Sequence, residues 1–494
     1  MRACIFTRAL LVAAGTLTPI GLLAQAPPAA VPPGQTTKGI VAKGKAPVSD
    51  SVLQVKLPRP QEGDLASGLH LMVLEDRRVP QITFQLLIPG AGGYYDPAEL
   101  PGLASFTAAV MREGTASRTS LQISEQLETL GATLGVSASM SSTEASIGGS
   151  SLTEHFDQLM DLAGDLLLDP SFPEDELGRY KQRTRAQLVQ QRSNPGFLAN
   201  EMISRVLYGA HPAARQSPTS QALDAVTRAQ LVEFHKARYA PDYAVLAIAG
   251  DISFAQARKV TEAKLAAWKK QGVSAPAVAD PQFPSAPKVH LVARPSSVQT
   301  SFVVGAPGID RISPDYDVLQ VMNKVVGGGP TGRLFILLRE DKGYTYAAYS
   351  GLTAGRYKGD WYAYTDVRNE VTAPALKDLI GEVTRIRDEV VPDKEFRDAK
   401  RSMVAAFALS LESPQAVLNN HITRWRYKLP ADYWDRYPER IAAVTQAQVQ
   451  EAAKKYLDPS RLQVVAVGDA KIADILKGYG TLEVYDTEGK RISN

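Results

Sequence analysis

The sequence predicts an α+β protein made of two homologous domains, and three observations support this. Strand-like and helical hydrophobic patterns alternate along the chain, a Pro-rich stretch interrupts them near the middle, and the pattern then restarts. After the restart, residues repeat earlier ones at a fixed offset. We expect two α/β-sandwich domains related by duplication, each a mixed or antiparallel sheet with helices packed on one face, together forming a clam-shell half.

The first half alternates strands and helices in a clear order. Apolar or alternating runs predict strands at 69–74, 81–88, 133–140, 143–149 and 243–249. Helical periodicity predicts helices at 102–112, 121–130, 152–168, 174–192 and 229–237. After the Pro-rich stretch, strands are expected at 289–292 and 300–304.

The repeat is carried by one helix and the strand after it. At an offset of 218 positions, the first set below matches the second. The sets are Val226, Thr227, Ala229, Gln230, Glu233, Lys236, Pro241, Gly250 and Asp251, and Val444, Thr445, Ala447, Gln448, Glu451, Lys454, Pro459, Gly468 and Asp469. A chance likeness between two amphipathic helices does not also align Pro and Gly-Asp, so we infer a duplication.

The N-terminus is expected to direct secretion. Residues 1–26 have a basic start, an apolar run and a small-x-small end, which together predict a cleaved signal peptide and a periplasmic protein. A membrane anchor is the alternative, but Gly15, Thr16 and Pro19 break the run. The expected order is then a flexible leader (27–64), a first domain (65–271), a linker (272–287) and a second domain (288–494).

Composition excludes several partners and sites. The formal net charge is +3, which argues against nucleic acid as a main partner, and no stable membrane insertion is expected. The single cysteine, Cys4, lies in the signal segment, so neither a disulfide framework nor a thiolate zinc cluster can form.

Several short motifs occur in a characteristic order along the chain. Pro101-Gly102-Leu103-Ala104 leads a helix that ends at Glu113-Gly114-Thr115. It is followed by Leu130-Gly131-Ala132, Asp169-Pro170-Ser171-Phe172-Pro173-Glu174, Asn194-Pro195, and Gly328-Gly329 with Gly332-Arg333-Leu334-Phe335. In order and spacing these motifs resemble those of the pitrilysin/insulinase-type peptidases, the inverted zincins. The resemblance covers roughly residues 62 to 485 and implies the two-domain fold described above.

The resemblance also implies a zinc site that this chain has lost. Active relatives carry His-x-x-Glu-His on the first helix, where two His four apart share one face and the Glu acts as general base. Those positions here are Ser105, Ala108 and Ala109, and the later Glu ligand is best matched by Gln187. Hydroxyl, methyl and amide groups cannot hold zinc, so no cofactor is expected in this chain.

The histidines offer no replacement site. The six are His70, His155, His211, His235, His290 and His421, and no two lie within five residues of each other. Zinc-binding pairs need helix or hairpin spacing, so we expect structural or surface roles for all six.

The second half keeps what the resemblance implies is the substrate-binding part of the site. Arg339, and Tyr346 seven residues later, match the family's Arg and Tyr that bind the scissile carbonyl. Both can donate a hydrogen bond to an oxygen that gains negative charge. Membership in a solvated charged run and an aromatic strand is the alternative for these residues.

The glycine-rich run Gly327, Gly328 and Gly329 is not a phosphate loop. The required Lys is replaced by Arg333, and the next residue is Leu334. A turn before a helix explains the run, and the resemblance weakly implies contact with a peptide substrate.

These features predict a non-catalytic subunit of a heterodimeric zinc metallopeptidase. A homologous partner with an intact His-x-x-Glu-His motif would hold the zinc, and Arg339 and Tyr346 would act on its peptide substrates. The alternatives are a purely structural scaffold, a module that binds peptides without cleaving them, and a metal-independent hydrolase using a nucleophile such as Ser105.

Overall fold

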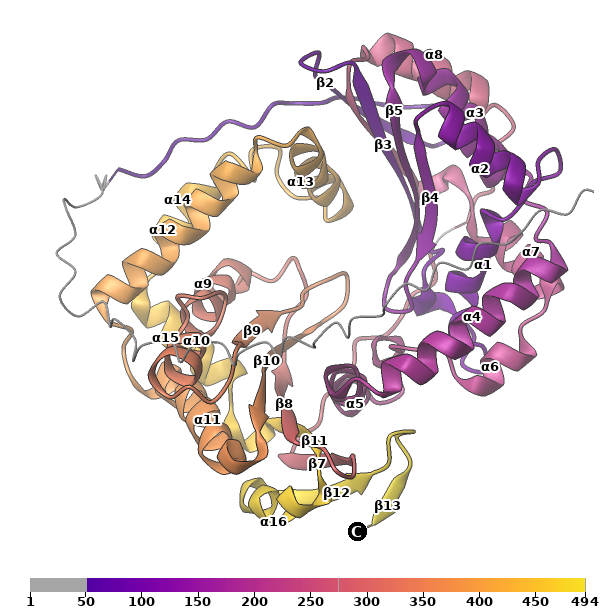
Figure 1. Cartoon of the computed structure of the whole chain (residues 1–494). Coiled ribbons are helices and arrows are strands. Elements are labelled where there is room, and N and C mark those ends of the chain that lie inside the picture. Colours follow the sequence, from indigo (N-terminus) through magenta and orange to yellow (C-terminus); the bar gives the residue numbers. More distant parts are fainter. Residues whose placement is uncertain (1–50, 274, 494) are drawn as a thin grey trace, which may run out of the picture. The chain divides into compact units, whose positions relative to one another are not determined.

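Two separate sheets organise the chain in this computed structural model, which describes residues 51–273 and 275–493 (Figure 1). The first sheet has six strands in the order β1-β2-β6-β3-β5-β4. Their bounds are β1 Gln61–Asp64, β2 His70–Glu75, β3 Gln81–Pro89, β4 Thr133–Ala138, β5 Glu144–Leu152 and β6 Val245–Gly250. The predicted signal segment, 1–26, and most of the predicted leader lie outside the described residues.

The second sheet has seven strands in the order β13-β12-β7-β11-β8-β10-β9. Their bounds are β7 Lys288–Ala293, β8 Gln299–Pro307, β9 Ala348–Leu352, β10 Asp360–Arg368, β11 Gln463–Gly468, β12 Thr481–Tyr485 and β13 Arg491–Ser493. β9 and β4 are the corresponding edge strands of the two sheets.

Strand register confirms the duplication. In the first sheet β2 runs parallel to β6 with His70 opposite Val245. In the second sheet β7 runs parallel to β11 with Lys288 opposite Gln463, and both numbers are 218 higher. Because a one-residue slip would reverse which side chains face the core, this shared register shows that both halves have the same core-facing pattern.

Helices of the first half are α1 Leu103–Met111, α2 Ser120–Thr129, α3 Phe156–Leu168, α4 Glu174–Arg192, α5 Pro195–Tyr208, α6 Ser220–Ala225, α7 Arg228–Arg238 and α8 Phe254–Lys264. Five of them, α1, α2, α3, α4 and α7, match predicted helical periods, whereas α5, α6 and α8 were not predicted. Capping boxes begin three of them: the side chain of Thr119, Thr227 or Ser253 accepts from the backbone N–H of a Gln three residues on. Each Gln side chain accepts the cap's own N–H in return, which satisfies donors that a helix start leaves free.

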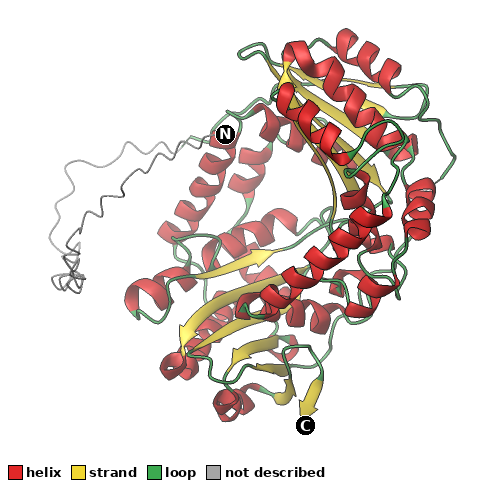
Figure 2. Cartoon of the chain, turned by 45° about the vertical axis from the view of Figure 1, so that its right-hand side comes forward, coloured by secondary structure: helices red, strands yellow, loops and turns green. Residues whose placement is uncertain are grey.

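Helices of the second half repeat this layout. They are α9 Tyr316–Val326, α10 Arg333–Phe335, α11 Thr372–Asp388, α12 Asp393–Ser410, α13 Pro414–Arg426, α14 Tyr437–Ala443, α15 Gln446–Tyr456 and α16 Ala473–Leu476. Thr445 and Gln448 form the capping box of α15, matching Thr227 and Gln230 of α7. Figure 2 shows the yellow strands of each sheet flanked by red helices.

The two halves exchange one helix each. On α5, Ile203 and Leu207 pack against β8 of the second sheet so closely that a side chain at Gly305 would clash with them. On α13, Val417 and Leu418 pack against β2, β3 and β6 of the first sheet. The sequence predicted helices on one face of each sheet. The structure shows in addition that a helix of the other half covers part of the opposite face.

An N-terminal strap also connects the halves. Leu57 is only 1% exposed, and its N–H donates to Asp435 Oδ1 at 2.9 Å. His421 on α13 contacts the Pro58 carbonyl oxygen through Nε2 at 2.8 Å. Composition places these residues in a flexible leader, but contacts made more than 360 positions away in sequence hold them in place.

Within the described residues, no helix is both long and apolar enough to cross a membrane.

Candidate functional site

Three of the four residues that we match to a zinc site lie on α1. Ser105 Oγ donates to the carbonyl oxygen of Ala138 in β4 at 2.6 Å, so its hydroxyl is already engaged with the sheet edge. Ala108 is buried and Ala109 half-buried. Spaced at i, i+3 and i+4, the three residues share one helix face but present only a hydroxyl and two methyl groups.

The fourth position, Gln187, lies exposed on α4. α1 and α4 pack through Phe106 and Tyr180, whose rings meet edge to face at 5.4 Å. The two helices that carry the four matched residues are therefore packed against each other. No group of three or more His, Cys, Asp or Glu that could hold a metal ion occurs among residues 51–273 and 275–493.

A buried carboxylate holds the start of α1. Asp96 accepts from the backbone N–H groups of Gly102 at 2.7 Å and Ala104 at 2.8 Å. Burial raises the pKa of Asp96 to about 6, although both hydrogen bonds oppose that rise. Gly102 has φ +103°, a conformation that favours glycine, so the turn into α1 depends on this residue.

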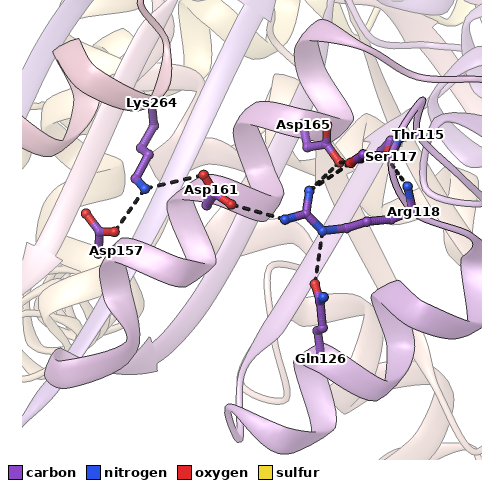
Figure 3. Close-up of polar contacts among 8 residues, drawn as sticks. All are labelled: Thr115, Ser117, Arg118, Gln126, Asp157, Asp161, Asp165 and Lys264. Atoms are coloured by element: carbon purple, nitrogen blue, oxygen red, sulfur yellow. Dashed lines mark hydrogen bonds and ion pairs between the residues drawn. The ribbon is translucent and has the colours of Figure 1, made fainter.

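An ion-pair network holds the other end of α1 (Figure 3). Arg118, in the loop to α2, donates to Asp165 at 2.5 Å and to Asp161 at 3.1 Å, both on α3. Thr115 and Ser117 also donate to Asp165, at 2.6 and 2.9 Å. Burial alone would raise the pKa of Asp165, but these hydrogen bonds hold it below its ordinary value.

The same network extends to α8. Lys264 lies 2.9 Å from Asp157 and 3.3 Å from Asp161, and Gln126 accepts from Arg118 Nε at 3.1 Å (Figure 3). The network therefore anchors the loop after α1 to α2, α3 and α8. It is a structural support for α1.

The structure brings the predicted pair, Arg339 and Tyr346, into contact. Arg339 lies in a π-helical segment, η5 (Ile336–Asp341), which follows α10. Its guanidinium carbon is 4.5 Å from the ring centre of Tyr346 and 4.7 Å from that of Phe335. Tyr346 is 82% exposed, whereas the Arg339 side chain is 35% exposed and its Nε lies 3.4 Å from Glu340. The stacked pair therefore presents a phenol and part of a guanidinium to solvent.

Aromatic side chains continue from this pair across the sheet. Phe335 stacks on Tyr349 of β9 at 5.5 Å, and Tyr349 lies 6.0 Å from Tyr364 of β10. Tyr349 and Tyr364 point away from the core, while Ala348 and Ala363 point into it. Sequence reasoning missed this aromatic row, although the alternation around residues 346–349 and 361–364 was a usable signal.

The glycine-rich run lies against β9. Ser350 donates its N–H to the Gly327 carbonyl oxygen at 2.9 Å, and a side chain at Gly327 would clash with the Ser350 backbone. Gly329 has φ +146°. The run is thus a tight turn beside the edge strand β9, where it contacts Ser350, the residue after Tyr349.

Arg333, at the position of a phosphate loop's Lys, is buried and already neutralised. Its Nε and Nη2 donate to the two carboxylate oxygens of Glu395 at 2.6 and 3.0 Å. This bidentate pair leaves it unavailable to a phosphate.

Four of the histidines make separate contacts. His70 lies 2.7 Å from Asp64 and 3.4 Å from Glu62, and His421 contacts Pro58. His235 contacts the Leu167 carbonyl oxygen at 2.8 Å, and His290 lies 3.5 Å from Glu483. His70 and His421 thus both contact residues 58–64, whereas His235 and His290 are held elsewhere in the fold.

Comparison with known proteins shows the family. Residues 71–218 match the family model described as Insulinase (Peptidase family M16), and residues 225–403 match the model described as Peptidase M16 inactive domain. The crystal structure of a peptidase M16 inactive domain from Pseudomonas fluorescens is 30% identical, with a TM-score of 0.77. That similarity covers 83% of this chain and 98% of the other. The chain therefore belongs to the M16 peptidase family.

Other relatives are more distant. A protein of Helicobacter pylori called non-peptidase homolog YmxG is 23% identical over 80% of this chain and 91% of its own length. An uncharacterized zinc protease YmxG of Bacillus subtilis is 23% identical over 72% and 85%. The crystal structure of a Helicobacter pylori protease, 16% identical with a TM-score of 0.75, shares the fold. Two of these matches thus carry names of inactive proteins: the model for residues 225–403 is described as an inactive domain, and the Helicobacter pylori relative as a non-peptidase homolog.

Proposed function

We propose that this protein is the non-catalytic subunit of a heterodimeric M16 peptidase that acts on peptides or unfolded segments. A homologous partner with an intact His-x-x-Glu-His motif would hold zinc, which supplies an activated water. Arg339 and Tyr346 of this chain would donate hydrogen bonds to the oxygen of the attacked carbonyl. The protein would act in the periplasm after removal of its signal peptide.

One observation supports the proposal: Arg339 and Tyr346 form a stacked pair with an exposed tyrosine. The residues of α1 that we match to a zinc motif offer only a hydroxyl and two methyl groups. An exposed tyrosine stacked on a guanidinium is pre-positioned, so little side-chain freedom is lost when a carbonyl arrives. Donors arranged for developing negative charge contribute about 2.7–4 kcal/mol each in comparable sites.

The test is cleavage of a quenched peptide by this chain alone, a zinc-motif partner alone, and the mixture. Only the mixture should cleave, and Arg339→Ala or Tyr346→Phe should each lower kcat about 10²–10³-fold while leaving assembly intact. The matched controls, Arg368→Ala and Tyr364→Phe, change an exposed Arg and an exposed Tyr of β10 and should retain activity.

Two results would favour the other candidates. Equal activity of the partner alone, or full activity of both variants in the mixture, would make this chain a scaffold. Saturable peptide binding by this chain with no cleavage by any mixture would make it a peptide-binding module.

A further inference from the structure

A cavity of about 760 Å³ lies where α13 ends, beside the loop between β9 and β10 and the ends of β3 and β5. This size falls within the range of small-ligand and peptide side-chain sites. The cavity combines aromatic rings with several cations. The residues that matter are Trp425, Tyr427, Arg356, Arg424, Arg426 and Lys428.

Positive charge exceeds negative charge around this cavity. Arg426 is paired with Glu144, a lining residue, at 2.5 Å, and Arg424 is paired with Glu62. Arg356 and Lys428 are exposed, and among the residues that the structure describes neither has an ion-pair partner. Arg424 Nε is buried without a hydrogen-bond partner, which leaves a further donor unsatisfied.

The backbone conformation of Lys428 is independent evidence that a cation at this position has a function. Lys428 has φ +51°, in a turn closed by its N–H to the Trp425 carbonyl and by the Leu429 N–H to the Arg424 carbonyl. Such helix ends usually carry glycine there. The equivalent helix α5 does end in a glycine, Gly209, with φ +56°. A lysine here therefore carries backbone strain that a glycine would avoid, which is typical of functional positions.

Helix electrostatics explains only part of the charge. Arg424 and Arg426 lie in the last turn of α13, where cations interact favourably with the helix dipole. Arg356 comes from the loop between β9 and β10, so the dipole of α13 does not explain it.

We propose that this cavity binds an acidic peptide segment, with Arg356 and Lys428 pairing with its carboxylates and Trp425 and Tyr427 packing against its side chains. Charge complementarity selects carboxylates, and the aromatic walls select a peptide over a free small anion. The site is separate from the Arg339–Tyr346 pair, because Tyr346 precedes β9 and Arg356 follows it. Identifying the bound peptide as a substrate rests on the proposed function, whereas binding itself does not.

The test measures fluorescence anisotropy of a labelled ten-residue peptide containing four Glu and one Tyr, titrated with the full mature chain alone. Matched peptides carry Gln or Lys in place of each Glu. The Glu peptide should bind best and should lose affinity as salt is raised, because exposed ion pairs are screened. Free glutamate at equal ionic strength should not displace it.

The variants separate binding from stability. Lys428→Gly and Arg356→Gln should each weaken binding of the Glu peptide about two- to fivefold, and the double variant about tenfold. Lys428→Gly should not lower the Tm, because glycine suits the positive φ. The matched control, Lys259→Gln, removes an exposed cation from α8 and should leave affinity unchanged.

Three outcomes would overturn the proposal: equal affinity for the Gln peptide, no binding of the Glu peptide, or unchanged affinity in the double variant. Displacement by free glutamate would show a small-anion site instead. Because no partner subunit is present, these results do not depend on whether the heterodimer exists.

Discussion

The two halves share a framework but differ where each crossing helix meets the other half's sheet. α5 ends at Tyr208, whose hydroxyl donates to Asp360 at the start of β10 at 2.7 Å. α13 ends at Arg426, which pairs with Glu144 at the start of β5, the equivalent strand. One half thus uses a neutral donor to a buried acid, and the other uses an ion pair. An acidic residue therefore stands at the start of the equivalent strand in both sheets, Asp360 in one and Glu144 in the other, but its partner differs.

The same contrast holds for chemistry. Strand register is shared by the two halves, yet the pair that we propose to bind a carbonyl, Arg339 and Tyr346, lies only in the second. Packing constrains core residues in both copies, whereas chemistry constrains only the copy that uses it. The predictions below test this contrast, from the largest effect to the smallest.

Introducing the zinc-binding residues of the motif into α1 and α4 should give the first half a metal site. The quadruple variant Ser105→His, Ala108→Glu, Ala109→His and Gln187→Glu should bind about one zinc per chain, because α1 and α4 still pack together. Metal analysis after dialysis measures this, with the unchanged chain as control. A folded variant that binds no zinc would show that the helix pair has lost the spacing as well as the side chains.

Shortening a buried side chain on α5 or α13 should destabilise the half whose sheet that helix covers. Leu207→Ala on α5 and Leu418→Ala on α13 each empty a fully buried site, at an expected cost of about 2–5 kcal/mol. Hydrogen exchange should rise in β8 and β11 for Leu207→Ala and in β6 for Leu418→Ala. If hydrogen exchange became faster only in the half that carries the substitution, α5 and α13 would not be stabilising the other half's sheet.

The buried acid of the second half should make stability depend on pH. Burial raises the pKa of Asp360, and its carboxylate meets the hydroxyls of Tyr208 and Thr353 but no cation among the described residues. A raised folded-state pKa means that the unfolding free energy is highest below the ordinary value of 3.8 and falls as pH rises through the folded-state pKa.

Asp360→Asn should remove this fall, because the amide does not ionise. Urea unfolding at several pH values measures the slope, and the exposed Asp341→Asn variant is the control. An unchanged slope in Asp360→Asn would assign the pH dependence to another group.

The smallest effect concerns the two helix ends. Lys428→Gly should raise the unfolding free energy by about 0.5–1 kcal/mol, and Gly209→Lys should lower it by a similar amount, because both positions have positive φ. Thermal unfolding measures both. Equal and opposite shifts would show equivalent turns, whereas a loss of stability in Lys428→Gly would mean that the lysine is kept for packing.

Local patterns predicted most of the fold. The repeat at an offset of 218 residues correctly predicted that the two sheets share a register. Strands and helix starts could be predicted because alternation and capping depend only on residues a few positions apart. The resemblance paired Arg339 with Tyr346, and their side chains are in contact, although the π-helical segment that carries Arg339 was not foreseen. What stayed hidden depends on distant partners. The amphipathic pattern of α5 shows an apolar face but not that β8 of the other half covers it, and nothing near Leu57 indicates Asp435.

The strap has a consequence for how the chain folds. Leu57 and Pro58 are made early in synthesis, but their partners, Asp435 and His421, emerge more than 360 residues later. Contacts so distant in sequence form slowly, because a long loop must close before they contribute. The first half therefore leaves the ribosome unable to finish its own structure, and the chain stays incompletely folded until synthesis is nearly done.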